Sequence, residues 1–142
     1  MHVRDLMRRE VMTLEATDDL GVAGGLMRLG SLRHLPVVAD GRVVGIVSQR
    51  DLFRAALSSL LQLRREAEHE WLAMFRVRAI MTPHVFSVAP SVTLRDAVEI
   101  MLDKRIGCLP VVEDGKLVGL LSESDCLRYL ARLLAVAEIG TA

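Results

Sequence analysis

The sequence predicts an α/β (α+β) fold in which two β-α-β-β-α repeats pack about a pseudo-two-fold axis. The chain repeats itself without a gap when it is shifted by 74 positions, which pairs Met7 with Met81. Each copy alternates between strand-like and helix-like stretches, and one copy alone is small for a stable core, so the two are expected to pack together. A single pair of copies is not a solenoid, which needs three or more repeats. The hydrophobic fraction of 51% over 142 residues is ample for a buried core.

The repeat is clearest in two stretches that share the same short sequence motifs. Residues 33–51 read RHLPVVADGRVVGIVSQRD, and residues 107–125 read GCLPVVEDGKLVGLLSESD. Methionines also recur at matching places, so we expect them to be packing residues rather than metal ligands. The expected organisation is a first repeat over 1–57, a helical linker over 58–76, a second repeat over 77–136 and a tail over 137–142.

Each repeat is expected to begin with a short strand and a helix. VMTL at 11–14 and VFSV at 85–88 are short apolar runs with strand character. Apolar residues then recur at a spacing of three and four from Leu94, and Thr93 is a suitable helix start. The matching stretch at 20–30 contains several glycines, each of which lowers helix stability by about 1 kcal/mol relative to alanine. We still expect a helix there.

A β-hairpin and a second helix complete each repeat. Two β-rich runs flank an Asp-Gly pair at 40–41, and two more flank the same pair at 114–115. This dipeptide is the strongest short signal for a hairpin turn. Apolar residues at helical spacing follow Ser48 and Ser122, so a helix is expected after each hairpin.

The linker at 58–76 belongs to neither repeat. Its apolar residues trace one side of a helix, and charges of alternating sign cover the other side. Two uses are equally open: a solvated connector packed on its own domain, or a dimer contact through Trp71 and Phe75.

Each hairpin ends in a Gly-x-x-Ser-x-x-Asp motif. The serine and the aspartate suit the first turn of a helix, where the hydroxyl accepts from a free N–H and the carboxylate is favoured by the helix dipole. The glycine lies inside a strand, where it commonly marks a bulge or the close approach of a backbone or ligand. Amides at a helix N-terminus also suit phosphate, and a carboxylate can accept both hydroxyls of a sugar diol. A helix start and a small-molecule corner are therefore both open.

These motifs resemble the CBS domain, the module named after cystathionine β-synthase. Residues 77–125, from VRAIMTPHVF to GLLSESD, look like a near-complete member, and residues 3–51 look like its partner. The resemblance implies a tandem pair, called a Bateman module, that dimerises into a flat disc. It also implies two clefts between the repeats that bind adenosine-containing ligands. One repeat provides a hydroxyl that faces the adenine, and the other provides the Asp that holds the ribose.

Carried over by position, the resemblance implies two clefts that differ at the phosphate end. The first would comprise Ser87, Gly45, Ser48 and Asp51, with Arg33, His34 and Arg50 at the phosphates. The second would comprise Thr13, Gly119, Ser122 and Asp125, with Gly107, Cys108 and Ser124 at the phosphates. Because a hydrogen bond to a charged group contributes about 1.5 to 3 kcal/mol, we expect the first cleft to be the better site for AMP, ADP or ATP. The second is expected to bind more weakly, to be empty or to take S-adenosylmethionine.

The expected function is a regulatory binding module that senses adenine nucleotides, with or without Mg²⁺, and signals by a conformational change. The alternatives are a protein–protein interaction module with vestigial clefts and an S-adenosylmethionine sensor. An enzyme is not expected, because no nucleophile has a recognisable base and no phosphate-binding glycine loop occurs. A homodimer and a regulated protein partner are the expected assemblies.

Charge and composition argue against several other classes. Eighteen Lys and Arg balance eighteen Asp and Glu, so no global field attracts nucleic acid. No apolar stretch approaches the roughly 18 to 20 residues of a membrane span, and MHVRDLMRRE has charges where a signal peptide is apolar. We therefore expect a cytoplasmic protein. Cys108 and Cys126 match no zinc spacing and are expected to be reduced structural thiols, and no metal or catalytic cofactor is expected.

Overall fold

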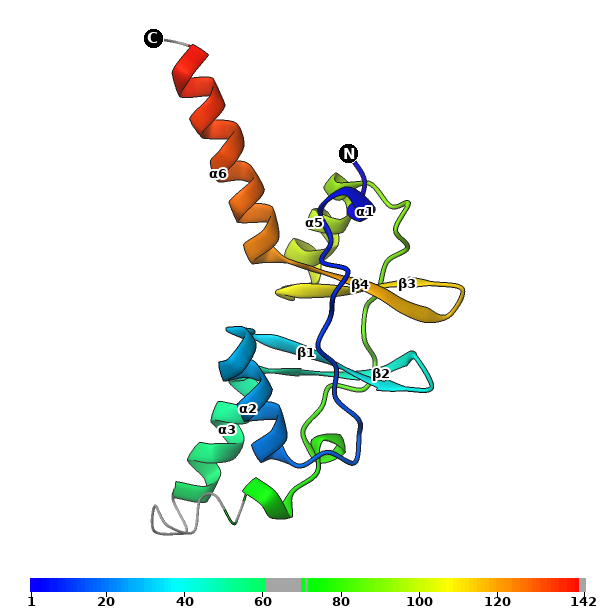
Figure 1. Ribbon diagram of the computed structural model, residues 1–142, viewed down its shortest axis with the longest axis vertical. Coiled ribbons are helices and arrows are strands. Elements are labelled where there is room, and N and C mark those ends of the chain that lie inside the picture. The colour runs from blue at the N-terminus through cyan, green and yellow to red at the C-terminus, as the bar shows by residue number, and fades with distance from the viewer. Residues whose placement is uncertain (61–69, 71, 141–142) are drawn as a thin grey trace. The chain divides into compact units, whose positions relative to one another are not determined.

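The computed structural model describes residues 1–60, 70 and 72–140, which fall into two compact units. The first-hairpin unit is Met12–Val85, and the second-hairpin unit is Met1–Val11 together with Phe86–Ala142. Each contains helices and a two-stranded antiparallel sheet (Figure 1). The predicted α+β fold class is therefore confirmed.

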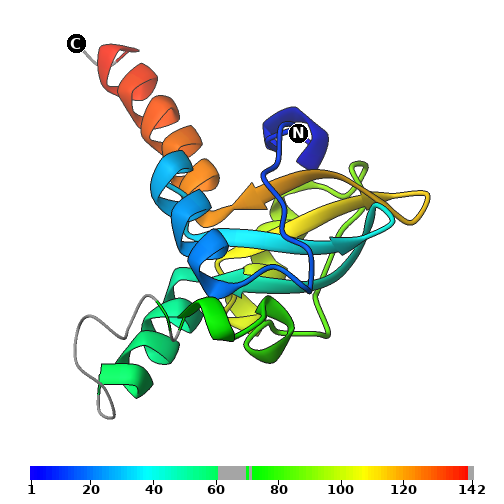
Figure 2. The ribbon, with the colours of Figure 1, turned by 60° about the horizontal axis from the view of Figure 1, so that its bottom comes forward.

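The first-hairpin unit contains the elements α2 (Leu20–Gly30), β1 (His34–Ala39), β2 (Arg42–Ser48), α3 (Gln49–Leu60) and the 3-10 helix η1 (Val77–Ala79). Figures 1 and 2 show α2 and α3 side by side next to the β1–β2 hairpin. The glycine-containing helix forms as predicted. Its N-terminus is capped by Asp19, whose side chain accepts a hydrogen bond from the N–H of Val22.

The second-hairpin unit contains α1 (Val3–Leu6), α5 (Leu94–Lys104), β3 (Cys108–Glu113), β4 (Lys116–Ser122) and α6 (Glu123–Gly140). Thr93 caps α5 as the sequence predicts, because its side chain accepts from the N–H of Asp96. The sequence does not predict α1 or its counterpart η1. Both are too short to display a hydrophobic period.

Both hairpins turn at the predicted Asp-Gly pairs. Asp40 and Gly41 have φ angles of 52° and 77°, and the second pair adopts nearly the same conformation. Positive φ at both central residues defines a type I′ turn, whose twist matches that of the flanking strands. The strand register shifts at a bulge after Val37, the residue that pairs with Gly45, and the second hairpin has the same shift at the equivalent place.

The opening strands predicted from VMTL and VFSV are shorter than expected, because each is reduced to one bridging residue, Leu14 or Val88. The N–H of Leu14 donates to the carbonyl of Pro36 at 2.9 Å, and its carbonyl accepts from Val38 at 2.8 Å. Proline has no N–H, so the parallel ladder cannot continue from Pro36 toward the beginning of the segment. Pro110 limits the second ladder in the same way.

Each hairpin is completed by the segment that opens the other repeat. Arg8, from the N-terminal segment, exchanges two backbone hydrogen bonds of 2.9 Å with Leu120 of β4. Thr82, which follows the linker, makes the matching pair of bonds with Ile46 of β2, at 3.0 and 2.9 Å. The segments that lead into the two repeats are thus exchanged between the units.

Each unit has its own hydrophobic core, and the exchanged segments contribute to it. Val3 is 0% exposed in the core of the second-hairpin unit, and Val77 is 0% exposed in the core of the other. Fully buried leucines and valines from the hairpins pack around them. Burial at this level ties each exchanged segment firmly to its hairpin.

The predicted dimer contact of the linker lies partly outside the described residues, because Trp71 is not among them. Phe75 belongs to the first-hairpin unit, where its carbonyl accepts a hydrogen bond from Leu20 at 3.1 Å. The dimer contact through these two aromatic residues stays a prediction.

Among the described residues, no helix combines the length and the apolar character needed to cross a bilayer.

Candidate functional site

Each Gly-x-x-Ser-x-x-Asp motif lies where a hairpin strand ends and a helix begins. In the first hairpin, Oδ2 of Asp51 accepts hydrogen bonds from both the N–H and the hydroxyl of Ser48, each at 2.7 Å. The hydroxyl in turn accepts from the N–H of Asp51 at 3.1 Å. These reciprocal bonds form a capping box, so the motif starts helix α3. Ser122 and Asp125 make the same three bonds at the start of α6.

The two motif glycines are explained by methionines that pack against them. A β-carbon on Gly45 would lie 2.5 Å from the sulfur of Met81, and one on Gly119 would lie 2.6 Å from the sulfur of Met7. Both distances are far below van der Waals contact, so any side chain there would force a rearrangement. The glycines therefore admit the exchanged segments, and the predicted packing role of these two methionines is confirmed.

The first-hairpin motif leaves one carboxylate oxygen available. The Asp51 side chain is half-buried, and Oδ1 has no hydrogen bond or ion pair among the described residues. A carboxylate offers about four lone-pair positions, of which the capping box uses two. This corner can therefore accept hydrogen bonds from a ligand without losing its helix cap.

The backbones of the predicted phosphate-end residues lie at the same corner. The carbonyl of Arg33 accepts from the N–H of Gln49, the first residue of α3, at 2.8 Å. His34 pairs directly with Ser48 in the β1–β2 ladder, and Arg50 lies in the first turn of α3. The structure thus brings these three basic residues to one helix N-terminus, where the backbone dipole also favours an anion.

The corner of the second hairpin has the same backbone and a different charge. The N–H of Glu123 donates to Gly107 at 3.0 Å, Cys108 pairs with Ser122, and Ser124 lies in the first turn of α6. Burial raises the pKa of the Cys108 thiol to about 12, with a further rise from Glu123 and an opposing effect from Arg8. The thiol therefore stays protonated at neutral pH and contributes no charge.

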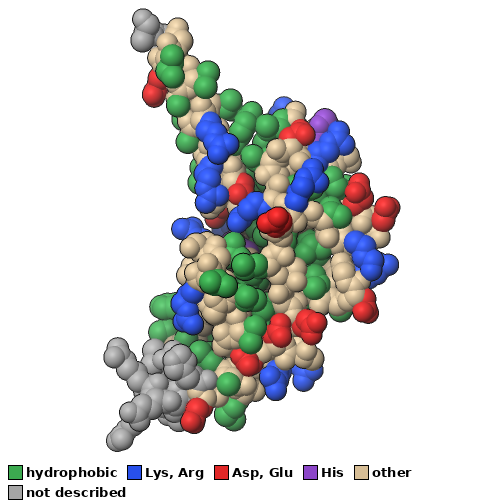
Figure 3. Space-filling view, in the orientation of Figure 1, with side chains coloured by type: hydrophobic (Ala, Val, Ile, Leu, Met, Phe, Trp, Pro, Cys, Tyr) green, Lys and Arg blue, Asp and Glu red, His purple; other side chains and the backbone are tan. Residues whose placement is uncertain are grey.

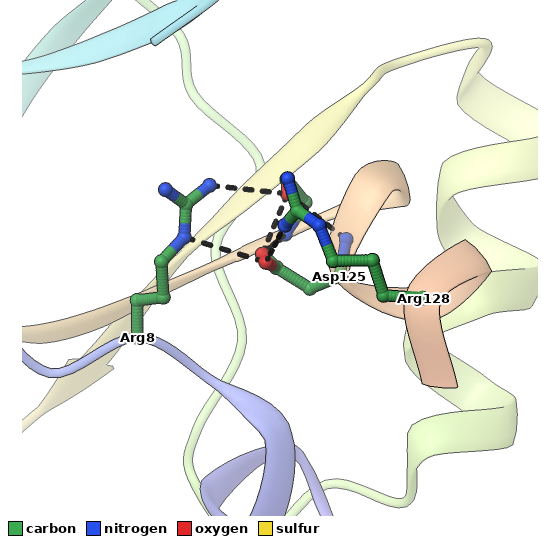
Figure 4. A network of polar contacts seen from close by, with 4 residues as sticks. Arg8, Asp125 and Arg128 are labelled. Atoms are coloured by element: carbon green, nitrogen blue, oxygen red, sulfur yellow. Dashed lines mark hydrogen bonds and ion pairs between the residues drawn. The ribbon is translucent and has the colours of Figure 1, made fainter. Parts of the chain in front are cut away.

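A network of arginines occupies the second-hairpin motif (Figure 4). Nε of Arg8 lies 3.4 Å from Oδ1 of Asp125, and Nη1 of Arg128 donates to the same oxygen at 3.2 Å. Arg8 also donates to the hydroxyl of Ser122 at 3.3 Å. The Asp125 side chain is only 8% exposed, so the network shields this carboxylate from water.

Arg8 and Arg128 are not among the residues that the sequence predicts for the site. Arg8 precedes the first repeat's motif by many residues, and only the exchange of segments brings it to the second hairpin. One signal was present: the shift of 74 positions pairs Arg8 with Thr82, so a charge stands where the other repeat has none.

Thr13 and Ser87 lie directly before the bridging residues Leu14 and Val88. Thr13 belongs to the first-hairpin unit and Ser87 to the second-hairpin unit. The pairing of Ser87 with Asp51, and of Thr13 with Asp125, therefore stays a prediction.

In the part of the chain that the structure describes, no three His, Cys, Asp or Glu side chains are grouped so that they could hold a metal ion.

The chain is similar to several known proteins, among them proteins of solved structure and part of a longer enzyme. The chain is 36% identical to a Vibrio cholerae protein provisionally named as acetoin utilization protein AcuB, with a TM-score of 0.79 and coverage of 97% of this chain and 96% of that one. It is 29% identical to CBSX2 in a crystal structure with AMP, with a TM-score of 0.74 and coverage of 93% and 97%. Over 118 residues it is 36% identical to inosine-5′-monophosphate dehydrogenase of Korarchaeum cryptofilum, but it spans only 22% of that enzyme and 82% of itself.

The family comparison covers both repeats. The model of the CBS domain matches residues 3–58 and again residues 77–132, which together make up most of the chain. Both matches include a complete hairpin and the capping motif that follows it. The chain therefore belongs to the CBS domain family and contains a tandem pair of these domains.

Proposed function

We propose that this chain is a regulatory module that binds AMP, ADP or ATP and signals their presence by a conformational change. The observation that carries the proposal is the corner of the first hairpin. There, a carboxylate with one oxygen that lacks a partner among the described residues lies at a helix N-terminus, and the backbones of three basic residues lie at the same place. The AMP bound to CBSX2, a protein 29% identical to this chain, supports an adenine nucleotide as the ligand class.

Each part of the corner suits one part of a nucleotide. Oδ1 of Asp51 is placed to accept the hydroxyls of a ribose, because the capping box occupies only Oδ2. Arg33 and Arg50 are both exposed and supply guanidinium donors for phosphate oxygens. Ser87, from the other repeat, is proposed to face the adenine. A ligand held by both repeats favours one arrangement of them over others, which is the requirement for a signal.

Calorimetric titration of AMP, ATP and S-adenosylmethionine tests the proposal. We expect AMP or ATP to bind the wild-type protein, and Asp51→Ala to weaken binding by at least tenfold, about 1.4 kcal/mol. Asp51→Asn separates binding from folding, because its amide oxygen can still accept from Ser48 while the negative charge is lost. It should also bind more weakly.

Asp96→Ala provides the matched control. Asp96 lies in the first turn of α5 after the capping residue Thr93, as Asp51 does in α3, and it is exposed. We expect its replacement to leave nucleotide affinity unchanged. Nucleotide affinity that survives in Asp51→Ala would show that the first-hairpin corner is not the site.

A second candidate function, a protein-interaction module that includes a homodimer, is favoured by helix α6. Figure 3 shows hydrophobic side chains along the visible face of this helix. Leu127, Leu130 and Leu134 recur at a spacing of three and four, and they are 63%, 48% and 55% exposed. An apolar stripe of this kind is typical of a surface that contacts another protein. Absence of any thermal shift with millimolar nucleotide would favour this function, since a ligand at 100 times its Kd stabilises by about 2.7 kcal/mol.

A further inference from the structure

The two capping motifs have the same backbone geometry, and besides the residues at the phosphate ends they differ in a side chain of the exchanged segment. Arg8 and Thr82 occupy equivalent positions, and each exchanges two backbone hydrogen bonds with the strand that carries the motif glycine. The strand, the turn and the helix cap are therefore constant between the repeats. The side chain at this position, Arg8 or Thr82, differs between two corners whose backbones are the same.

This difference decides how many acceptor positions each carboxylate has left. In Asp125, Oδ2 accepts from the N–H and hydroxyl of Ser122, and Oδ1 faces the two guanidinium groups of Arg8 and Arg128. The four lone-pair positions of the carboxylate are thus engaged. In Asp51, the same cap engages Oδ2, and Oδ1 has no polar partner among the described residues.

Of the two arginines at Asp125, Arg8 is the one without a counterpart in the first repeat, because Thr82 takes its position there. The first repeat also has an arginine at the position equivalent to Arg128, namely Arg54, and it makes no ion pair with Asp51 in the described part of the chain. Arg8 contacts both members of the second cap, since it reaches the Ser122 hydroxyl as well as the carboxylate. Its side chain is 41% exposed, so it can leave Asp125 without unfolding the unit.

We propose that Arg8 is an internal competitor for the Asp125 carboxylate, which closes the second-hairpin corner to a ribose diol and leaves the first-hairpin corner as the nucleoside site. A diol must displace a guanidinium from Asp125, whereas at Asp51 it meets an oxygen that has no polar partner among the residues that the structure describes. This inference rests on the proposed function, because it explains which of the two motifs a nucleotide uses. It assigns the difference between them to one side chain, in addition to the charges at the phosphate ends.

Exchange of the two side chains tests the inference. Arg8→Thr gives the second motif the side chain of the first, and Arg8→Gln removes the charge while retaining much of the length. Calorimetric titration with AMP, and separately with adenosine, measures the number of sites per chain. We expect one site in the wild type, which Asp51→Ala removes. Arg8→Thr should add a second site, or tighten a weak one at least tenfold, and Asp125→Ala should remove that gain.

Thr82→Arg is the reciprocal variant. The matching backbone bonds of Thr82 and Arg8 place the new arginine where it can reach Asp51, so we expect a loss of affinity of at least tenfold at the first corner. Arg95→Gln is the control, because it removes another arginine of the second-hairpin unit, one that pairs with the exposed Glu99 on the same helix. Far-UV circular dichroism of each variant verifies that it is folded.

The possible outcomes separate this inference from the proposed function. If the wild type binds AMP and Arg8→Thr and Arg8→Gln change neither the number of sites nor their affinity, the competitor role is wrong and the proposed function stands. If both Arg8 variants lose a site, Arg8 contributes to binding and the inference is overturned. If no variant binds AMP, ATP or adenosine, the proposed function fails and the inference fails with it.

Discussion

Gly45 and Gly119 show that the Gly-x-x-Ser-x-x-Asp motif has a structural basis at the level of single residues. Methionine sulfurs of the exchanged segments fill the space where a β-carbon would lie, and the following serine and aspartate cap a helix. Neither feature requires a ligand. The cap does not engage Oδ1 of Asp51, and the equivalent oxygen of Asp125 is engaged by Arg8.

Replacement of Gly119 by alanine tests the packing explanation. Its new β-carbon would meet the sulfur of Met7 and lie 3.0 Å from the backbone carbonyl of Arg8, which is held in the β4 ladder. We expect Gly119→Ala to reduce the free energy of unfolding by about 1 to 3 kcal/mol, measured by urea denaturation. Met7→Ala should relieve part of this cost, so that the double variant is less destabilised than the sum of the single ones.

Gly24→Ala is the matched control for this variant. A β-carbon on Gly24, in the middle of α2, would have no neighbour within 4 Å, so the substitution should raise helix stability by roughly 0.5 to 1 kcal/mol. Equal effects at the two positions would show that contact with Met7 is not the reason for the glycine in β4.

At the level of elements, local signals predicted most of the fold. The Asp-Gly turns, the cap of α5 by Thr93 and the helices after Ser48 and Ser122 each depend on residues a few positions apart, so the pattern could identify them. The length of the opening strands depends on Pro36 in another strand, and the pairing of Arg8 with Asp125 depends on a contact between residues far apart in sequence. Hydrophobic periodicity carries no information about either contact, so neither could be predicted from the sequence.

The apolar face of α6 gives a prediction at this level. We expect the wild-type protein to form a homodimer in solution and Leu130→Glu combined with Leu134→Glu to shift it toward the monomer, because two carboxylates would be buried in the contact. Size-exclusion chromatography with light scattering measures the mass. Leu102→Glu, at a residue of α5 that is 71% exposed, should leave the mass unchanged. A double variant that keeps the wild-type mass would show that α6 is not the contact.

At the level of the whole molecule, the two compact units do not coincide with the two repeats along the chain. The family model follows the chain, with matches at residues 3–58 and 77–132. The compact units instead combine residues 1–11 with the second hairpin and retain the segment up to Val85 with the first. A substitution near the N-terminus is therefore expected to act on the later repeat.

A pair of equivalent valines tests this arrangement. Val3→Ala and Val77→Ala each remove two methyl groups from a fully buried position, at a cost on the order of 2 kcal/mol. Hydrogen–deuterium exchange should become faster in β3 and β4 for Val3→Ala, and in β1 and β2 for Val77→Ala. The opposite assignment, with Val3→Ala acting on β1 and β2, would contradict the exchange of segments.

Because of the exchanged segments, the polypeptide cannot be divided between its repeats without consequence. A single repeat produced alone would hold a valine and a methionine that fit the other hairpin, and its own hairpin would have an exposed edge and a glycine with nothing against it. It could fill that vacancy only with the same segment from a second molecule. Each repeat therefore depends on a second repeat for a complete hairpin. The linker provides that second repeat within the same chain.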